Sequence, residues 1–190
     1  MYTLFIDTHS EKAIVILFKN NEVISLKESI NQSHSSSMTL MINNSLSENN
    51  INFKDLGMIL VVNGPGSFTG IRIGITIAKT MAYSLNIPIK VLTSLELQAI
   101  SSSLDKKLAT YFDKNGYYIG LFDNDNKLQG EYLYLKENEL KDYLTTHKLE
   151  NNILKNDVDY LKVLEYTKNL KAVNPHEVKP LYVKKIEVEK

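Results

Sequence analysis

The feature that most constrains the fold is a glycine-rich turn between a buried strand and a long helix. Residues 58–62 form a continuous apolar run, which is typical of a strand covered on both faces of its sheet. The run ends in Asn63-Gly64-Pro65-Gly66-Ser67-Phe68-Thr69-Gly70, and the pattern over 71–85 then predicts a helix. A strand, a tight turn and a helix in this order indicate an α/β protein.

The rest of the first hundred residues extends this unit. A hairpin turn is predicted at Asn20-Asn21, because asparagine tolerates positive φ. The order β-β-β-α-β-α-β-α predicts a mixed sheet covered by helices, as in the ribonuclease-H-like half of actin-type folds. The predicted elements are strands at 2–6, 13–18, 23–27, 58–62 and 89–92, and helices at 33–47, 71–85 and from 93 or 94 to 101.

The second half predicts a smaller copy of the same architecture. Its strand-forming runs are separated by Asn115-Gly116 and Asp125-Asn126, which are turn signals. We therefore expect two lobes, with residues 1–102 in the first and 103–190 in the second, and a boundary within 101–105. The runs are strands at 107–112, 117–122 and 128–135, followed by helices at 137–145 and 157–170.

Composition limits the classes of function. The chain has 190 residues, with 22 Lys+Arg against 22 Asp+Glu, so its formal net charge is zero. Proteins that bind nucleic acid alone are usually basic, so autonomous tRNA binding is disfavoured. The sequence has no cysteine, which excludes disulfides, thiolate metal sites and a cysteine nucleophile. It has neither a signal-peptide pattern nor an apolar run of about 18 residues, so a soluble cytoplasmic protein is expected.

The glycine-rich turn has two interpretations. Backbone N–H groups at the start of the next helix could hold an anion. However, the Walker and Rossmann patterns both fail, since no Gly-Lys-Ser/Thr occurs and Thr69 stands where a third glycine should be. The alternative is a tight turn in which Gly70 and Gly74 let the helix lie close on the sheet.

Two helices carry unusual apolar faces. On the helix over 71–85 the apolar arc covers roughly 200°, beside a polar stripe, where a surface helix shows about 100°. Either the helix is buried in the core, or one side packs on the sheet and the other on a second protein. In the helix over 33–47, Leu40 lies opposite the apolar face. The polar stripe is Arg72, Thr76, Lys79, Thr80 and Tyr83, and the apolar face of the earlier helix is Met38, Met41, Ile42 and Leu46.

No catalytic or metal-binding set can be assembled. A helical metal pair starting at His34 would need a ligand at 37, 38 or 41, and these positions hold Ser37, Met38 and Met41. Asp7 ends the first strand, where actin-type ATPases have an aspartate that helps to hold magnesium. No glycine occurs before Gly57, so the hairpin that would wrap phosphates lacks the residue that permits close backbone approach. We therefore predict no catalytic residue, no metal and no cofactor.

The segment from Gly64 to Ala82 closely resembles the signature of the TsaB family, in which Gly-Pro-Gly-Ser-Phe-Thr-Gly-Leu-Arg-Ile-Gly leads into a helix. Other segments agree in order, namely Ile6-Asp7-Thr8, Ser33-His34-Ser35, Ile87-Pro88, Thr93-Ser94-Leu95-Glu96, Asp113 to Tyr118 and Pro180-Leu181-Tyr182-Val183. The departures lie mostly in the second half, where Lys114 and Lys184 replace arginines and the lobe is shorter than usual.

The resemblance implies a non-catalytic scaffold and activator of TsaD, in the complex that transfers threonylcarbamoyl to N6 of the adenosine 3′ of the anticodon. TsaE would join the complex, tRNA would be bound only through it, and a homodimer through the same helices is possible. The implied interface residues are His34, Met38, Leu40, Met41, Ile73, Ile77 and Met81. The signature loop is Gly64, Pro65, Gly66, Ser67, Phe68, Thr69 and Gly70, with Arg72.

Two rival functions remain from the residues alone. One is an enzyme, either a small actin-fold kinase or a relict metallopeptidase. The glycine-poor first hairpin and the missing metal pair argue against both. The other is a homodimeric binding module unrelated to tRNA, and the specificity of the signature argues against it.

Overall fold

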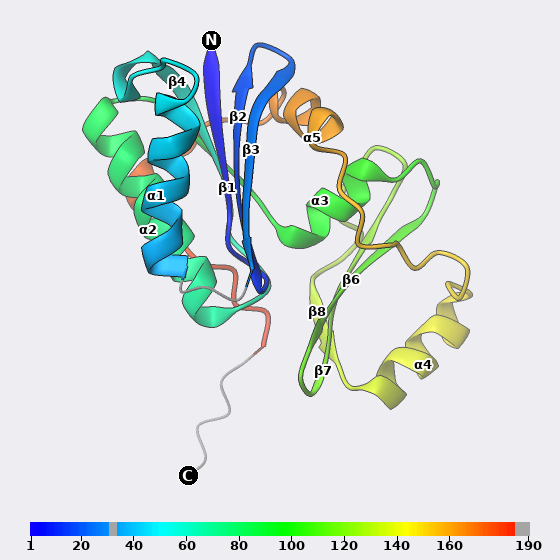
Figure 1. The fold of residues 1–190 in the computed structure, drawn as a ribbon. Coiled ribbons are helices and arrows are strands. Elements are labelled where there is room, and N and C mark those ends of the chain that lie inside the picture. The colour runs from blue at the N-terminus through cyan, green and yellow to red at the C-terminus, as the bar shows by residue number, and fades with distance from the viewer. Residues whose placement is uncertain (31–33, 185–190) are drawn as a thin grey trace.

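Two β-sheets with helices packed on them form the protein, and Figure 1 shows them as neighbouring lobes. The structure is a computed structural model that describes residues 1–30 and 34–184, except for the side chains of His34 and Ser35. Its elements are β1 (Tyr2–Asp7), β2 (Lys12–Lys19), β3 (Glu22–Ile30), α1 (His34–Ser47), η1 (Phe53–Asp55), β4 (Leu56–Val62), α2 (Phe68–Leu85), β5 (Ile89–Leu92), α3 (Ser94–Ser101), β6 (Lys107–Asp113), β7 (Gly116–Phe122), β8 (Leu133–Leu135), α4 (Glu137–His147), α5 (Tyr160–Thr167) and η2 (Pro175–Glu177).

The first sheet is mixed, as predicted. Its strand order is β3-β2-β1-β4-β5, with antiparallel pairing in the meander β1–β2–β3 and parallel pairing of β1 with β4 and of β4 with β5. Asn20 adopts φ 55° at the first hairpin, which is the conformation that asparagine tolerates. The parallel connections through α1 and α2 place the end of β4 and the start of α2 beside the end of β1.

Helices cover both faces of this sheet. On one face α1 and α2 lie side by side, and their apolar side chains share a core with Leu4, Ile6 and Val15. On the other face α3 and α5 pack on Phe5, Ile16 and Leu60. Because β1 and β4 are covered on both sides, their sequences read as continuous apolar runs rather than alternating ones.

The second sheet is smaller and its ladders are antiparallel. Its order is β6-β7-β8, and α4 covers one face while α3 of the first lobe packs against the other. An isolated parallel bridge joins Leu108 of β6 to Ile153, which follows α4. This bridge corresponds to the parallel pairing of β1 with β4 in the first sheet. The predicted strand over 128–135 is shortened to β8, and the predicted helix over 157–170 is shortened to α5.

The end of the chain returns to the first lobe. Val163 and Leu164 of α5 belong to one core of the first sheet, and Val178 is buried in the core on the other face, which also contains residues of α1 and α2. The division into 1–102 and 103–190 therefore stays a proposal, and its second part supplies packing to both sheets. We name residues 173–184 the C-terminal strap. Among the described residues, no helix is long and apolar enough to cross a membrane.

Candidate functional site

The glycine-rich turn is held by hydrogen bonds to two neighbouring elements. The Ser67 N–H donates to the His9 carbonyl at 2.6 Å, just beyond β1. The Ser94 hydroxyl donates to the Pro65 carbonyl at 2.6 Å, at the start of α3. The Ser67 hydroxyl caps α2 by accepting from the Gly70 N–H at 3.2 Å. These contacts engage the Ser67 and Gly70 N–H groups within the chain, which favours the tight-turn interpretation over an anion site.

Two glycines bring this turn and α2 onto the end of β1. A β-carbon at Gly66 would collide with the His9 backbone, and one at Gly74 would collide with the Thr8 hydroxyl. That hydroxyl donates to the Gly70 carbonyl at 2.7 Å, so it fixes β1 to the first turn of α2. Glycine at these two positions therefore allows the turn and α2 to pack closely on the end of β1, and this packing fixes the orientation of α2.

Helix α2 has three sides. The side toward the sheet is buried, and the second side carries the predicted polar stripe. Lys79 Nζ donates to the carbonyls of Val178 at 3.0 Å and His176 at 3.3 Å, and the Tyr83 ring lies 5.0 Å from the His176 ring. Lys79 and Tyr83 of the stripe thus contact the C-terminal strap. The buried side consists of Gly70, Ile71, Gly74, Ile75, Ala78 and Ala82.

Sequence reasoning missed the strap. It identified the stripe and matched Pro180-Leu181-Tyr182-Val183 to the family's pattern, but it assigned neither a partner within the chain. The only sequence feature that pointed toward the strap was the polar stripe, in which Lys79 and Tyr83 lie in line with Arg72. In the structure, Arg72 donates from Nε to the Tyr182 hydroxyl at 2.9 Å. Lys79 binds the backbone carbonyls of His176 and Val178, which no pattern of side chains in the strap could indicate.

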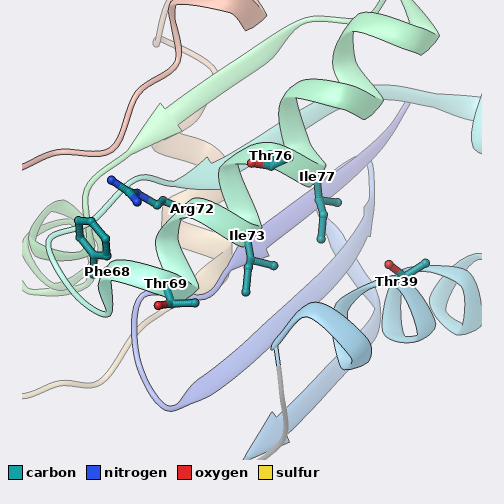
Figure 2. A pocket seen from close by; sticks show the side chains of 7 residues that line it. All are labelled: Thr39, Phe68, Thr69, Arg72, Ile73, Thr76 and Ile77. Carbon is teal, nitrogen blue, oxygen red and sulfur yellow. The ribbon is translucent and has the colours of Figure 1, made fainter.

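The third side of α2 is open and forms a groove with α1. Figure 2 shows Ile73 and Ile77 on α2 pointing to the side where Thr39 of α1 lies, and Arg72 beside Phe68 at one end. The groove has a volume of about 430 Å³. Leu40 on α1 is 60% exposed, and Ile73 and Ile77 are half-buried against the core. The residues that line the groove are Thr39, Phe68, Thr69, Arg72, Ile73, Thr76 and Ile77.

The structure corrects part of the predicted interface. Met38 and Met41 are 0% and 8% exposed and pack in the core between α1 and the first sheet, so they present no surface to a partner. Met81 is half-buried against the same core. His34 begins α1, but its side chain lies outside the described part of the chain. Of the predicted set, Leu40, Ile73 and Ile77 lie on the open surface.

A buried polar pair lies where β1 meets the second lobe. The Asp7 carboxylate accepts from the His9 N–H at 3.0 Å and lies 2.7 Å from His9 Nδ1, and both side chains are buried. Tyr111 of β6 donates its hydroxyl to the His9 carbonyl at 3.2 Å, and its ring lies 5.3 Å from the imidazole. The pair therefore links the two lobes.

The electrostatics of this pair follow from burial and contact. Burial lowers the pKa of His9, but the Asp7 charge and its hydrogen bond outweigh it and leave that pKa raised. Burial raises the pKa of Tyr111, and the Asp113 and Asp7 carboxylates raise it further. The carboxylates at the ends of β1 and β6, Asp7 and Asp113, therefore both raise the pKa of Tyr111. In the described residues, no group of three His, Cys, Asp or Glu side chains could hold a metal ion.

Comparisons with known proteins find a TsaD family model and relatives named TsaB. The model described as TsaD, tRNA N6-adenosine threonylcarbamoyltransferase, matches residues 21–115. The tRNA threonylcarbamoyladenosine biosynthesis protein TsaB of Bacillus subtilis is 36% identical over 132 residues, which cover 67% of this chain and 58% of that protein. TsaB of Buchnera aphidicola subsp. Acyrthosiphon pisum is 30% identical over 155 residues, 78% of this chain and 69% of that protein.

A solved structure gives the same fold. YeaZ from Pseudomonas aeruginosa superimposes with a TM-score of 0.78 at 17% identity, over 95% of this chain and 100% of that chain. At this identity the likeness bears on the fold, and it confirms the predicted two-lobed α/β architecture. In the sequence comparison, the chain spans 58% of the length of the Bacillus relative.

Proposed function

Since this chain belongs to the TsaB (YeaZ) family of tRNA threonylcarbamoyladenosine biosynthesis proteins, we propose that it is a non-catalytic scaffold and activator in that biosynthesis. Its direct partner is a TsaD-type transferase, and the complex modifies N6 of the adenosine 3′ of the anticodon. TsaE joins the same complex. The cytoplasm is the proposed location.

The open surface of α1 and α2 carries the proposal. Leu40 is 60% exposed, and Ile73 and Ile77 line a groove whose other members include three threonines. Apolar side chains surrounded by hydroxyl groups, with few charges, are typical of the centre of a protein–protein interface. A helix of the partner fits a groove of this kind, because helix pairs pack by inserting side chains between those of a neighbour.

The state of Asp7 supports a non-catalytic role. Its carboxylate is buried and engaged by two groups of His9, and Tyr111 lies against the same imidazole. An aspartate that assisted a phosphate reaction would have to leave these contacts. Met38 is buried in the core, at a position that a helical metal pair with His34 would require.

Charge supports binding of tRNA through the complex. The formal net charge of the chain is zero, with 22 basic and 22 acidic residues. Neutralisation of phosphates supplies much of the affinity for nucleic acid, so the transferase has to provide most of the tRNA contacts.

Reconstitution of tRNA modification tests the role. TsaD and TsaE from the same organism would be mixed with a substrate tRNA, threonine, bicarbonate, ATP and the enzyme that makes threonylcarbamoyl-adenylate, with and without this chain. We expect incorporation of threonylcarbamoyl to fall to background when the chain is omitted. Equal incorporation without it would contradict the scaffold role.

A substitution at Asp7 tests whether the chain acts as a scaffold or as an enzyme. Asp7→Asn keeps one oxygen acceptor for the His9 N–H and removes the charge, so a variant that stays folded should support modification at the wild-type rate. A folded Asp7→Asn variant that binds TsaD normally but supports no modification would place chemistry in this chain.

A further inference from the structure

Among the described residues that line the groove, Arg72 has the only charged side chain, and the structure holds it in one place. Its guanidinium carbon lies 3.7 Å from the centre of the Phe68 ring and 5.9 Å from that of Tyr182. Its Nε donates to the Tyr182 hydroxyl at 2.9 Å. A planar guanidinium between two rings, with Nε fixed, has little freedom left to lose when a ligand binds.

The terminal nitrogens of Arg72 remain available. Within the described residues no acceptor bonds to them, and Arg72 and both rings are exposed, Phe68 at 53% and Tyr182 at 52%. These nitrogens form the part of the guanidinium that binds a carboxylate with two parallel hydrogen bonds. The rim of the groove therefore offers a prearranged site for an acidic group.

The two helices themselves contain no acidic residue. Neither His34–Ser47 nor Phe68–Leu85 includes Asp or Glu, whereas α2 contains Arg72 and Lys79. A two-fold homodimer would bring the same pair of helices from each copy together. Arg72 of each copy would then face a helix pair that contains no carboxylate.

We propose that Arg72 binds an acidic side chain on the docking helix of the TsaD-type partner, and that this contact makes the surface select that partner over a second copy of the chain. This inference rests on the proposed function of the groove. Tyr182 acts as a positioning residue, because it holds Nε and leaves the terminal nitrogens free. The far end of the chain thereby contributes to partner choice.

Titration of TsaD binding by calorimetry tests the contact. Arg72→Gln removes the charge and keeps a polar side chain, and we expect the dissociation constant for TsaD of the same organism to rise at least about tenfold at about 0.05 M salt. Charge attraction is screened at high salt, so wild type and variant should converge at about 0.5 M. Arg72→Lys keeps the charge without the fork and should lose part of the affinity. Tyr182→Phe should weaken binding by about threefold through freer motion of the guanidinium.

The matched control removes a charge elsewhere. Lys155 is an exposed lysine of the second lobe, and Lys155→Gln should bind TsaD as wild type does. Self-association, measured by sedimentation of the chain alone, should not weaken in Arg72→Gln, because α1 and α2 of a second copy offer Arg72 no carboxylate. Self-association that weakens in Arg72→Gln would contradict the selection of partner over self.

The outcomes separate this inference from the proposed function. Suppose that wild type binds TsaD and Ile77→Glu does not. If folded Arg72→Gln then binds with wild-type affinity at low salt, the proposed contact of Arg72 with an acidic side chain is wrong, but the interface through α1 and α2 stands. If wild type does not bind TsaD at all, the proposed function fails. If Arg72→Gln does not fold, the same salt series is measured on wild type and Arg72→Lys. TsaD binding that is independent of salt in both proteins would contradict the proposed contact of Arg72 with an acidic side chain.

Discussion

Gly74 lets α2 lie directly on the end of β1. A methyl group there would collide with the Thr8 hydroxyl, which donates to the Gly70 carbonyl. Alanine favours a helix over glycine by about 1 kcal/mol, but the collision and the lost hydrogen bond outweigh that gain. We expect Gly74→Ala to lower the free energy of unfolding by about 1–3 kcal/mol in urea denaturation.

The control for this prediction removes the obstacle. Thr8→Ala loses the hydrogen bond on its own, and adding Gly74→Ala to it should cost much less than it does in the wild-type background. If Gly74→Ala alone raised stability, the close contact between α2 and β1 would be wrong.

His9 makes stability depend on pH. Burial lowers its pKa, but Asp7 outweighs burial, so the pKa of His9 is raised above its value in the unfolded chain. A raised pKa means that the folded state binds the proton more tightly. The stabilisation is fully present below the unfolded pKa of about 6.5, and it is lost as pH rises through the folded pKa.

Urea denaturation over a series of pH values tests this dependence. In His9→Gln the fall in unfolding free energy above about pH 6.5 should disappear, and at lower pH the variant should be about 1–3 kcal/mol less stable, because Asp7 loses its charged partner. The other three histidines stay in both proteins, so the difference between the curves reports His9. Parallel curves would contradict the ion pair.

At the scale of elements, periodicity indicated which residues share a helix face but not what covers that face. The apolar face of α1 was identified correctly, yet Met38 and Met41 face the sheet rather than a partner. Hydropathy alone cannot separate these cases, because a core and an interface both exclude water. Leu40 was informative because it stands alone among polar residues on the opposite side.

The C-terminal strap is an element that the sequence could not reveal. Val178 is 4% exposed and packs in the core under α1 and α2. We expect Val178→Ala to lower the free energy of unfolding by about 1–3 kcal/mol. Val173→Ala is the matched control, since Val173 is 39% exposed and bridges Ile89 through its backbone. Equal effects of the two changes would show that the strap is not packed as described.

At the scale of the whole molecule, the predicted order of elements was sufficient to predict the fold of the first lobe. It did not predict that α5 and the C-terminal strap return to the first sheet. The predicted meander and the glycine turn are local patterns, and the structure confirms both. The return of α5 to the first sheet depends on a contact between distant segments, which periodicity cannot detect. The same holds for the link from Tyr111 to His9 between the lobes.

This path predicts that the two lobes unfold together. Leu164 of α5 is 4% exposed in the core of the first sheet, so Leu164→Ala should cost about 2–5 kcal/mol. Hydrogen exchange of β1 and β2 amides should accelerate in that variant. Leu161→Ala, on the exposed side of α5, should leave exchange unchanged. Unchanged protection of the first sheet in Leu164→Ala would mean that residues 1–102 fold without the second half.

The proposed binding of a TsaD-type partner by α1 and α2 is tested most directly by the dissociation constant of Ile77→Glu with TsaD of the same organism. A carboxylate at Ile77 would be buried without a partner, so we expect affinity to fall by about 100-fold or more, and Leu40→Glu should act in the same direction. Leu161→Glu places the same charge on an exposed apolar position of α5 and should bind as wild type does. Thermal melts would establish that each variant is folded. Wild-type affinity in a folded Ile77→Glu variant would contradict the account.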